Sequence, residues 1–279
     1  MNIVIIGAGI AGLTAAETIR KNNPSYNVVL FSNERQSPYY RPRLPEVVSG
    51  KTSPDKLYVH PDTWFKELNL EFRKGENVVE ICLDNNQVRG SLGSRLLFDR
   101  ILLATGAQPF LPDVVKKFQL PGIYPLRTLN DAVDLNYKAK KAKKALQLGS
   151  GLLGLELGNA LTTLGLEVHV LELSDRILPY QTTPKSSLKL QGMLEKKGFV
   201  FHLKSEAMEA QGKERLERVL LKSGEVIDVD LMAVSTGITP NLSLATALEL
   251  KIEKGIVVDQ YMETTKPGIY AAGDCAQTP

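Results

Sequence analysis

The glycine-rich stretch at the N-terminus constrains this chain more than any other feature. Residues 3–12 read IVIIGAGIAG, in which four apolar residues, typical of a buried parallel strand, precede Gly7, Gly9 and Gly12. Residues 13–20 then read as a helix. In this context Gly7 permits a tight turn, Gly9 lets the backbone approach a pyrophosphate, and Gly12 lets helix and strand pack closely. The helix N-terminus offers N–H groups to the anion, so the stretch predicts a dinucleotide-binding unit rather than an ordinary glycine turn.

The same spacing occurs a second time. Residues 146–156 read LQLGSGLLGLE and hold Gly149, Gly151 and Gly154. The strand, Ser/Thr-Gly and x-x-Pro pattern of residues 99–109 is also repeated at 230–241. The sequence therefore predicts an α/β fold with two Rossmann-like units in a three-layer ββα arrangement, each holding one dinucleotide.

Acidic residues follow both glycine motifs at the distance where a Rossmann unit binds ribose hydroxyls, about 20 residues on. After the first motif the candidates are Asn33 and Glu34, which follow a strand over 27–31. We favour Glu34, and a solvated loop charge is the alternative.

After the second motif, Glu172 lies at the end of a strand over 167–173. A carboxylate there accepts hydrogen bonds from both ribose hydroxyls of NAD and repels a 2′-phosphate. No arginine stands directly beside it, although Arg176 is near, so we expect NADH rather than NADPH. The alternative is a surface glutamate.

Composition limits the class of protein. The chain has 279 residues, of which 43% are hydrophobic and 23% charged, which suits a soluble protein of two domains. A net charge of +3 gives no reason to expect nucleic acid. Cys82 and Cys275 form no C-x-x-C and the three histidines share no metal spacing, so we expect neither a disulfide framework nor a metal. The first strand begins at Asn2 and no apolar run is long enough for a membrane, so we expect a cytoplasmic protein.

Two charged stretches have competing interpretations. Residues 37–51 contain Tyr39, Tyr40, Arg41 and Arg43 among prolines, which exclude a regular helix up to Pro45. This stretch is either a loop that grips a pyrophosphate or covers a flat ring, or an exposed turn.

The second charged stretch is lysine-rich, at residues 137–144. It follows a helix that Thr128 and Asp131 are expected to cap. We favour a solvated helix end over a surface that steers an acidic redox partner.

Five motifs, in this order, resemble the pyridine-nucleotide-disulfide oxidoreductase superfamily: IVIIGAGIAG, LLATGAQP, LQLGSGLLGLE, VSTGITPN and TTKPGIYAAGDCA. The likeness is greatest to NADH:rubredoxin oxidoreductases, through YYRPRL at 39–44 and PLRTLNDA at 125–132. Ferredoxin reductases and the flavoprotein part of assimilatory nitrite reductases are also similar. The resemblance implies an FAD-binding domain over residues 1–112 and 243–279, with an NADH-binding domain over 113–242 inserted in it.

The resemblance also implies an activity. FAD would take hydride from NADH and pass electrons to a small iron protein, rubredoxin or ferredoxin. The alternatives are a flavoprotein module of a nitrite or ferredoxin reductase, and a fragment that binds nucleotides without turnover.

The resemblance also implies which residues form the sites. Arg41 and Pro42 would line the flavin and phosphates, Val79 the adenine, and Asp274 the ribityl chain, while Glu156 would sit near the flavin and nicotinamide rings as the catalytic candidate. The expected FAD contacts are Gly7, Ala8, Gly9, Ile10, Ala11, Gly12, Asn33, Glu34, Arg41, Pro42, Val79, Ala104, Thr105, Gly106, Arg127, Gly273 and Asp274. The expected NAD contacts are Gly149, Gly151, Leu152, Leu153, Gly154, Glu172 and Gly237.

The chain departs from the family pattern in several places. The stretch RPRLPEVVSG has no cysteine, so disulfide-reducing chemistry lacks its nucleophile. Glu46 stands where ferredoxin-reductase relatives often have lysine, and Asn33 replaces an acid. Relatives continue into a third domain used for dimerisation, whereas this chain ends soon after Asp274, so we expect that domain to be absent and make no prediction of oligomeric state.

Overall fold

The computed structural model describes residues 1–118 and 120–278 and divides into two compact units. Unit 1 comprises Met1–Tyr40, Tyr58–Gln108 and Thr239–Pro279, of which residue 279 lies outside the described residues. Unit 2 comprises Arg41–Leu57 and Pro109–Ile238.

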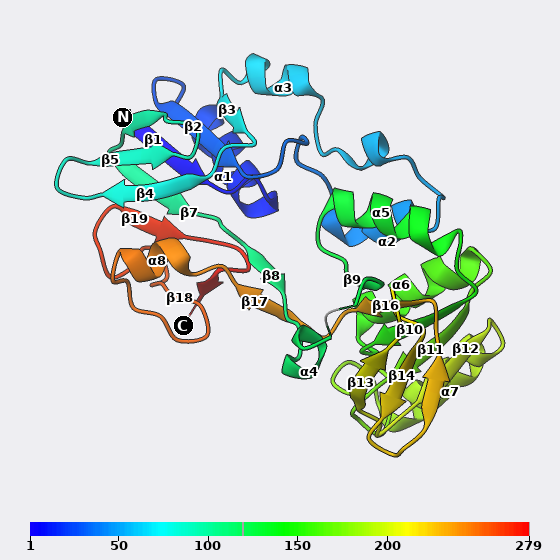
Figure 1. The fold of residues 1–279 in the computed structure, drawn as a ribbon. Helices are drawn as coiled ribbons and strands as arrows, with labels where there is room; N and C mark the ends of the chain where they lie inside the picture. The colour runs from blue at the N-terminus through cyan, green and yellow to red at the C-terminus, as the bar shows by residue number, and fades with distance from the viewer. Residues whose placement is uncertain (119, 279) are drawn as a thin grey trace. The chain divides into compact units, whose positions relative to one another are not determined.

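A five-stranded parallel sheet forms the centre of unit 1, in the order β19-β7-β1-β2-β3 (Figure 1). Its strands are β1 (Asn2–Ile6), β2 (Asn27–Ser32), β3 (Glu71–Lys74), β7 (Arg100–Leu103) and β19 (Ile269–Ala271). Because β2 and β7 lie on opposite sides of β1, the strand order reverses there. The carboxyl ends of β1 and β7 thus form the edge at which open α/β sheets bind ligands.

Two further layers cover this sheet. On one face Val4 and Ile6 pack with Val78 and Val88 of an antiparallel sheet. On the other face Ile3 and Ile5 of the same strand pack with residues of α1, so β1 is buried on both sides, as its apolar sequence predicts. The covering elements are β4 (Val78–Cys82), β5 (Gln87–Gly90), β6 (Arg95–Leu97), α1 (Ile10–Asn22), α3 (Asp62–Glu67) and α8 (Ser243–Ala247).

Unit 2 repeats this plan. Its parallel sheet has the order β12-β11-β10-β16-β9, with the reversal at β10 and β16. Leu146 and Leu148 of β10 pack with Val219 and Ile227 of a second antiparallel sheet. The strands of the parallel sheet are β9 (Ile123–Pro125), β10 (Lys144–Leu148), β11 (Glu167–Leu171), β12 (Phe199–His202) and β16 (Leu231–Val234), and those of the antiparallel sheet are β13 (Ala207–Gln211), β14 (Arg218–Leu221) and β15 (Val226–Asp228).

The helices of unit 2 include one that the sequence does not predict. Helix α2 begins at Leu44, before Pro45, although the prolines are expected to exclude helix that far. Proline is tolerated in a first turn because its missing N–H has no intrahelical partner there. The helices are α2 (Leu44–Val48), α4 (Asp113–Lys116), α5 (Leu129–Ala139), α6 (Leu152–Thr163) and α7 (Pro184–Glu195).

Short elements complete the chain. The structure adds β8 (Ala107–Pro109), which pairs with β17 (Ile238–Pro240), and β18 (Ile256–Val257), which pairs with β20 (Ala276–Gln277). The 3-10 helices are η1 (Arg41–Arg43) and η2 (Pro54–Leu57). The paired strands β8 and β17 each follow a Thr-Gly pair and each end on the proline of the repeated x-x-Pro pattern.

Candidate dinucleotide sites

The first glycine turn has no room for a side chain at two of its three glycines. Gly7 follows β1 at a φ of +113°, and a Cβ there would lie 2.0 Å from the carbonyl oxygen of Ala104. A Cβ at Gly12 would lie 2.0 Å from the carbonyl oxygen of Gly7. At Gly9 a Cβ would meet nothing within 4 Å. Gly7 and Gly12 are therefore required by the fold, whereas Gly9 leaves open space in front of α1.

The start of α1 faces this open space. Its N-cap, Gly9, supplies no side-chain hydrogen bond, and the first turn contains no acidic residue. Ile10 is 62% exposed, and Ala8 and Ala11 are half-buried. Gly273 approaches the same turn, since a Cβ there would lie 3.0 Å from the Cβ of Ala11, and the exposed Asp274 follows it. The N–H groups of a helix start arranged in this way suit an anion.

A cleft of about 450 Å³ lies at the carboxyl ends of β1, β2 and β7 in unit 1. Gly7, Asn33 and Thr105, three of the expected FAD contacts, line it. Its volume is within the range of small-molecule sites, about 300–1,000 Å³.

Asn33 and Glu34 have different surroundings. Asn33 is exposed and lines the cleft. The Glu34 carboxylate accepts a hydrogen bond of 2.5 Å from the Tyr39 hydroxyl, and the Glu34 N–H donates to Ser32 Oγ. Val79 is 47% exposed on β4.

The Ala104–Gly106 segment is fixed by hydrogen bonds to two other segments. The Ala104 N–H donates to the Ile6 carbonyl, which ties this segment to β1. Thr105 Oγ1 donates to the Asn241 carbonyl at 2.9 Å, and Asn241 Nδ2 donates to the Thr105 carbonyl at 2.8 Å. The Asn241 N–H also donates to the Gly106 carbonyl, so a segment distant in sequence holds this region of the cleft wall.

Three expected FAD contacts lie in unit 2. Arg41 donates to the Arg127 carbonyl at 2.8 Å, and Pro42 follows in η1. The Arg43 guanidinium donates two hydrogen bonds to the Glu46 carboxylate, both with a length of 2.8 Å. The segment 41–57, which the sequence analysis assigned to the FAD domain, thus groups with the unit that carries the second glycine motif.

The second glycine turn has the geometry of the first. Gly149 has a φ of +91°, and its Cβ would lie 2.5 Å from the Ser235 carbonyl oxygen. A Cβ at Gly154 would lie 2.2 Å from the Gly149 carbonyl oxygen, and one at Gly151 would meet nothing within 4 Å. Leu152 and Leu153 are exposed at the start of α6, whose N-cap again supplies no side-chain hydrogen bond. Gly237 is exposed just beyond β16.

Glu172 follows β11, and its carboxylate is bound to the glycine turn. Oε2 accepts from the N–H of Ser150 at 3.0 Å and from its hydroxyl at 2.6 Å, while Oε1 accepts from the Ser174 N–H at 2.8 Å. Burial acts to raise the pKa of Glu172, but the hydrogen bonds from Ser150 and Ser174 outweigh it, and the pKa lies below its ordinary value. Arg176 is held by Asp175 and the Pro179 carbonyl.

The chain matches a known protein family over its whole length. The family model described as "Pyridine nucleotide-disulphide oxidoreductase" matches residues 1–279. The chain belongs to this family. Membership confirms the expected family, and the similar solved structures confirm the expected α/β fold with Rossmann-like units.

Three similar proteins illustrate the membership. The "Assimilatory nitrate reductase electron transfer subunit" of Bacillus subtilis is 33% identical over 99% of this chain and 36% of its own length. The "Rubredoxin-NAD(+) reductase" of Pseudomonas putida is 32% identical over 99% of this chain and 72% of its own. The crystal structure of a ferredoxin reductase from Rhodopseudomonas palustris superposes with a TM-score of 0.94 at 30% identity, covering 99% of this chain and 69% of that one. The chain thus spans between about a third and three quarters of the length of these relatives.

The open space at Gly9, the helix start and the cleft fit the dinucleotide that the family uses. A group with a pyrophosphate has a place in front of α1, and an adenosine half has a place in the adjoining cleft. The same features at Gly151 and α6 fit the second dinucleotide.

Three polar residues of these sites are missed by sequence reasoning. Ser150 stands between the glycines and binds Glu172, a role that its place in the motif G-S-G could have suggested. Asn241 braces Thr105, and Glu76 lines the cleft as a carboxylate that is only 3% exposed. Nothing in the local sequence marks these last two, because their partners lie far away along the chain.

Neighbouring strands bring two histidines together. His169 Nδ1 lies 3.0 Å from His202 Nε2, and their outer nitrogens face Glu167 and Glu225.

Within residues 1–118 and 120–278 no group of three or more His, Cys, Asp or Glu is arranged to hold a metal ion. Over the same residues, none of the helices is both long and apolar enough to cross a bilayer.

Proposed function

We propose that this chain is an FAD-dependent NADH oxidoreductase, or the dinucleotide-binding portion of one, which delivers electrons to a small iron protein such as rubredoxin. The observation that carries the proposal is the pair of glycine turns. Both leave open space at the middle glycine, before a helix that has no side-chain cap. Two pyrophosphate sites in one chain suit a protein that moves electrons between two dinucleotides.

Unit 1 is proposed to hold FAD. The start of α1 would bind the pyrophosphate, and the cleft beyond Gly7 would hold the adenosine half. Gly273 approaches the first turn of α1, which supports the role proposed for Asp274 on the ribityl chain. Arg41, Pro42 and Arg127 remain proposed contacts of the same cofactor.

Unit 2 is proposed to hold NADH. The start of α6 would bind its pyrophosphate, with Leu152, Leu153 and Gly237 beside it. Glu172 is ionised at neutral pH because its pKa lies below the ordinary value. A carboxylate accepts hydrogen bonds from ribose hydroxyls and repels a 2′-phosphate, so NADH is preferred over NADPH.

Chemistry between the two dinucleotides needs little from side chains. Bound FAD supplies the capacity to accept hydride from NADH and to release electrons singly. The residues of the chain would bind the two dinucleotides, orient their rings and shield them from water. Glu156, exposed on α6, is proposed to lie beside the reacting rings.

The electron acceptor is proposed from the relatives, two of which are named for rubredoxin and ferredoxin. The lysine run at 137–144 gives little support for a docking surface. The run starts in the last turn of α5 and ends at Lys144, the first residue of β10. The five residues of β10 span about 16 Å, so the run lies at the opposite end of this strand from the glycine turn.

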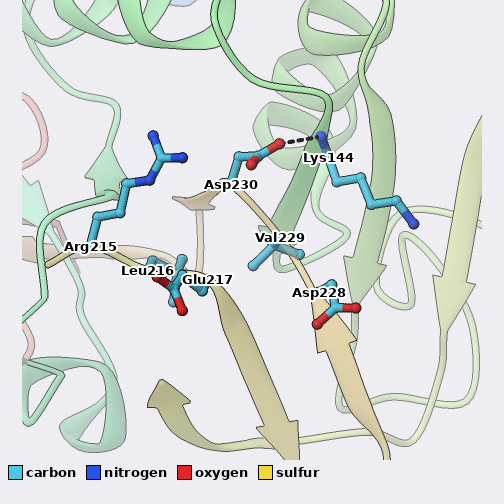
Figure 2. A pocket seen from close by; sticks show the side chains of 7 residues that line it. All are labelled: Lys144, Arg215, Leu216, Glu217, Asp228, Val229 and Asp230. Atoms are coloured by element: carbon cyan, nitrogen blue, oxygen red, sulfur yellow. Dashed lines mark hydrogen bonds between the residues drawn. The ribbon is translucent and has the colours of Figure 1, made fainter. Parts of the chain in front are cut away.

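Charges around the end of this run are mixed. A small hollow of about 140 Å³ there is lined by Lys144 and Arg215 but also by three acids (Figure 2). The Lys144 N–H donates to Asp230 at 3.0 Å, and the Lys144 ammonium lies 3.1 Å from Glu167. We therefore retain the solvated helix end as the interpretation of the lysine run.

A second candidate function is an electron-transfer module of a larger reductase. The support is the Bacillus subtilis nitrate reductase subunit, of which this chain covers only 36%. In that case the acceptor would be a redox centre of the larger assembly instead of rubredoxin. A fragment that binds nucleotides without turnover is the remaining alternative.

The test is an absorption spectrum of the purified chain with FAD, followed by anaerobic NADH and, separately, NADPH. We expect a flavin band near 450 nm that bleaches much faster with NADH. Rubredoxin and ferredoxin are then added as acceptors, and rubredoxin is expected to reoxidise the flavin. Bound flavin that NADH does not bleach would contradict the oxidoreductase proposal, and reoxidation by ferredoxin alone would contradict the acceptor.

A further inference from the structure

Glu76 is a buried carboxylate in the wall of the unit 1 cleft. It lies between β3 and β4, is 3% exposed, and lines the cleft together with Gly7 and Asn33. A carboxylate in such a position costs free energy unless its oxygens find hydrogen-bond donors. Its surroundings therefore indicate what it is placed to bind.

One oxygen of Glu76 is fixed by the protein. Ser94 Oγ donates to Oε1 at 2.6 Å. A Cβ at Gly90 would lie 2.0 Å from the same oxygen, so the glycine leaves the room that this carboxylate occupies. The other oxygen, Oε2, lies 4.0 Å from Arg73 Nη1, beyond hydrogen-bond distance. The side chain is thus anchored at Oε1 by a hydrogen bond, while Oε2 forms a longer ion pair with Arg73.

The backbone places Glu76 next to the end of β2. Its N–H donates to the Ser32 carbonyl at 2.8 Å, and Asn33 follows Ser32 directly. Rossmann units use a carboxylate at this strand end to bind the adenosine ribose. In this chain Asn33 carries an amide there, and the next carboxylate, Glu34, accepts a hydrogen bond from Tyr39.

We propose that Glu76, from the β3–β4 connection, supplies the carboxylate that accepts hydrogen bonds from the adenosine ribose hydroxyls of the dinucleotide in unit 1. Asn33 lines the cleft beside it, and Ser94 orients the carboxylate. This inference rests on the proposed binding of FAD by unit 1, and it reassigns a role that the sequence favoured for Glu34.

The test compares Glu76→Gln with wild type in flavin-binding titrations of the apoprotein. The ligands are FAD and its analogue with 2′-deoxyadenosine, because FAD fluorescence reports the flavin site whatever binds in unit 2. Hydrogen bonds to a charged group are worth about 1.5–3 kcal/mol, so wild type should prefer FAD by about tenfold or more. In Glu76→Gln we expect FAD affinity to fall about tenfold and the preference for FAD over the analogue to disappear.

Two matched variants serve as controls. Glu80→Gln removes a carboxylate that is exposed on β4 and paired with Arg89, and it should behave as wild type. Glu34→Gln should keep the preference for FAD. If Glu76→Gln does not fold, Ser94→Ala removes only the orienting hydroxyl, and it is expected to reduce the preference severalfold.

Four outcomes would overturn the inference. The first is a preference for FAD over the analogue that is unchanged in Glu76→Gln, or in Ser94→Ala where that variant replaces it. The second is a loss of affinity in Glu76→Gln that is equal for FAD and the analogue. The third is a preference for FAD that is lost in Glu34→Gln instead. The fourth, wild type that binds no FAD, would overturn the proposed function as well, so the two failures are distinguishable.

Discussion

Three glycines of one turn meet three different surroundings. Gly7 has a positive φ and lies against the Ala104 carbonyl, and Gly12 lies against the Gly7 carbonyl. Gly9 has φ −68° and ψ −179°, an extended conformation that any residue adopts, with open space where a side chain would be. A side chain at Gly12 should therefore lower the stability of the fold, whereas one at Gly9 should weaken cofactor binding.

The matched variants Gly9→Ala and Gly12→Ala test this separation. In the apoprotein, Gly9→Ala should be as stable as wild type or more stable by about 0.4–1 kcal/mol, because alanine restricts the unfolded chain. It should still weaken FAD binding by about tenfold or more, since the new methyl group fills the space left for a pyrophosphate. Gly12→Ala should lose about 1–3 kcal/mol or more of stability, because backbone must shift. Denaturant unfolding and FAD titration check both, and a Gly9→Ala protein that binds FAD normally would contradict the assignment.

At the scale of single residues, the sequence predicts the glycine turns but does not predict which side chains bond to one another. The glycines can be assigned from spacing, because their roles depend on the local strand–turn–helix geometry. Spacing favours Glu34 too, and its role stays a prediction, but spacing does not reveal that its carboxylate accepts a hydrogen bond from Tyr39. Glu76 escapes prediction because Ser94 and Gly90, which define its position, come from another strand pair.

Among the elements, the start of α5 shows how a local signal determines a boundary. Thr128 Oγ1 accepts from the Asp131 N–H at 3.1 Å, and Asp131 Oδ2 accepts from the Thr128 N–H at 2.7 Å. Both halves of the expected capping box are present. Thr128→Ala should therefore lower the free energy of unfolding by about 1 kcal/mol, since one donor of the first turn loses its acceptor.

The control for this variant is Thr18→Ala, at an exposed position inside α1. Its effect should stay within about 0.5 kcal/mol, because alanine has the higher helix propensity and little packing is lost. Both proteins are compared with wild type by chemical unfolding of the apoprotein. Equal stabilities for the two variants would show that the box does not hold the start of α5.

Elements with a strong local pattern agree with the sequence, and those without one do not. The buried strands β1 and β10 and the helices after them have apolar and glycine signals that need no tertiary information. Helix α2 is not predicted, because Pro45 argues locally against helix, whereas its five residues are supported by contacts with α5 and by Asn136 donating to the Val48 carbonyl.

At the scale of the whole molecule, the repeated motifs correspond to a repeated architecture. Four strands correspond in order, β3-β2-β1-β7 in unit 1 and β12-β11-β10-β16 in unit 2, and the connections β3–β7 and β12–β16 each carry a three-stranded antiparallel sheet. The fifth strand differs, since β19 follows the other four in the chain whereas β9 precedes them. The shared order can be predicted because the repeat covers strands and turns as well as glycines. The assignment of residues 41–57 to unit 2 cannot be predicted from the sequence, because their packing partners, α5 and α6, lie about a hundred residues further along the chain.

Separate cores in the two units lead to a prediction about ligands. A ligand stabilises the unit that binds it, by about 2.7 kcal/mol at a hundredfold excess over its dissociation constant. FAD should therefore slow hydrogen exchange in β1, α1 and the cleft segments of unit 1. ADP-ribose, added to FAD-saturated protein, should slow exchange around Gly149–Gly154 and Glu172 in unit 2.

Gly151→Ala makes the experiment specific. A Cβ at Gly151 meets nothing within 4 Å, so this variant should fold and keep the FAD-induced protection of unit 1. It should lose the protection by ADP-ribose in unit 2, because the methyl group occupies the space for the second pyrophosphate. Gly9→Ala should show the reverse pattern. ADP-ribose protection of α1, or one unit responding to both ligands, would contradict the assignment of FAD to unit 1 and NADH to unit 2. Hydrogen exchange is measured by mass spectrometry, which follows the two glycine turns separately. Ligand protection should remain at the first turn in Gly151→Ala and at the second turn in Gly9→Ala.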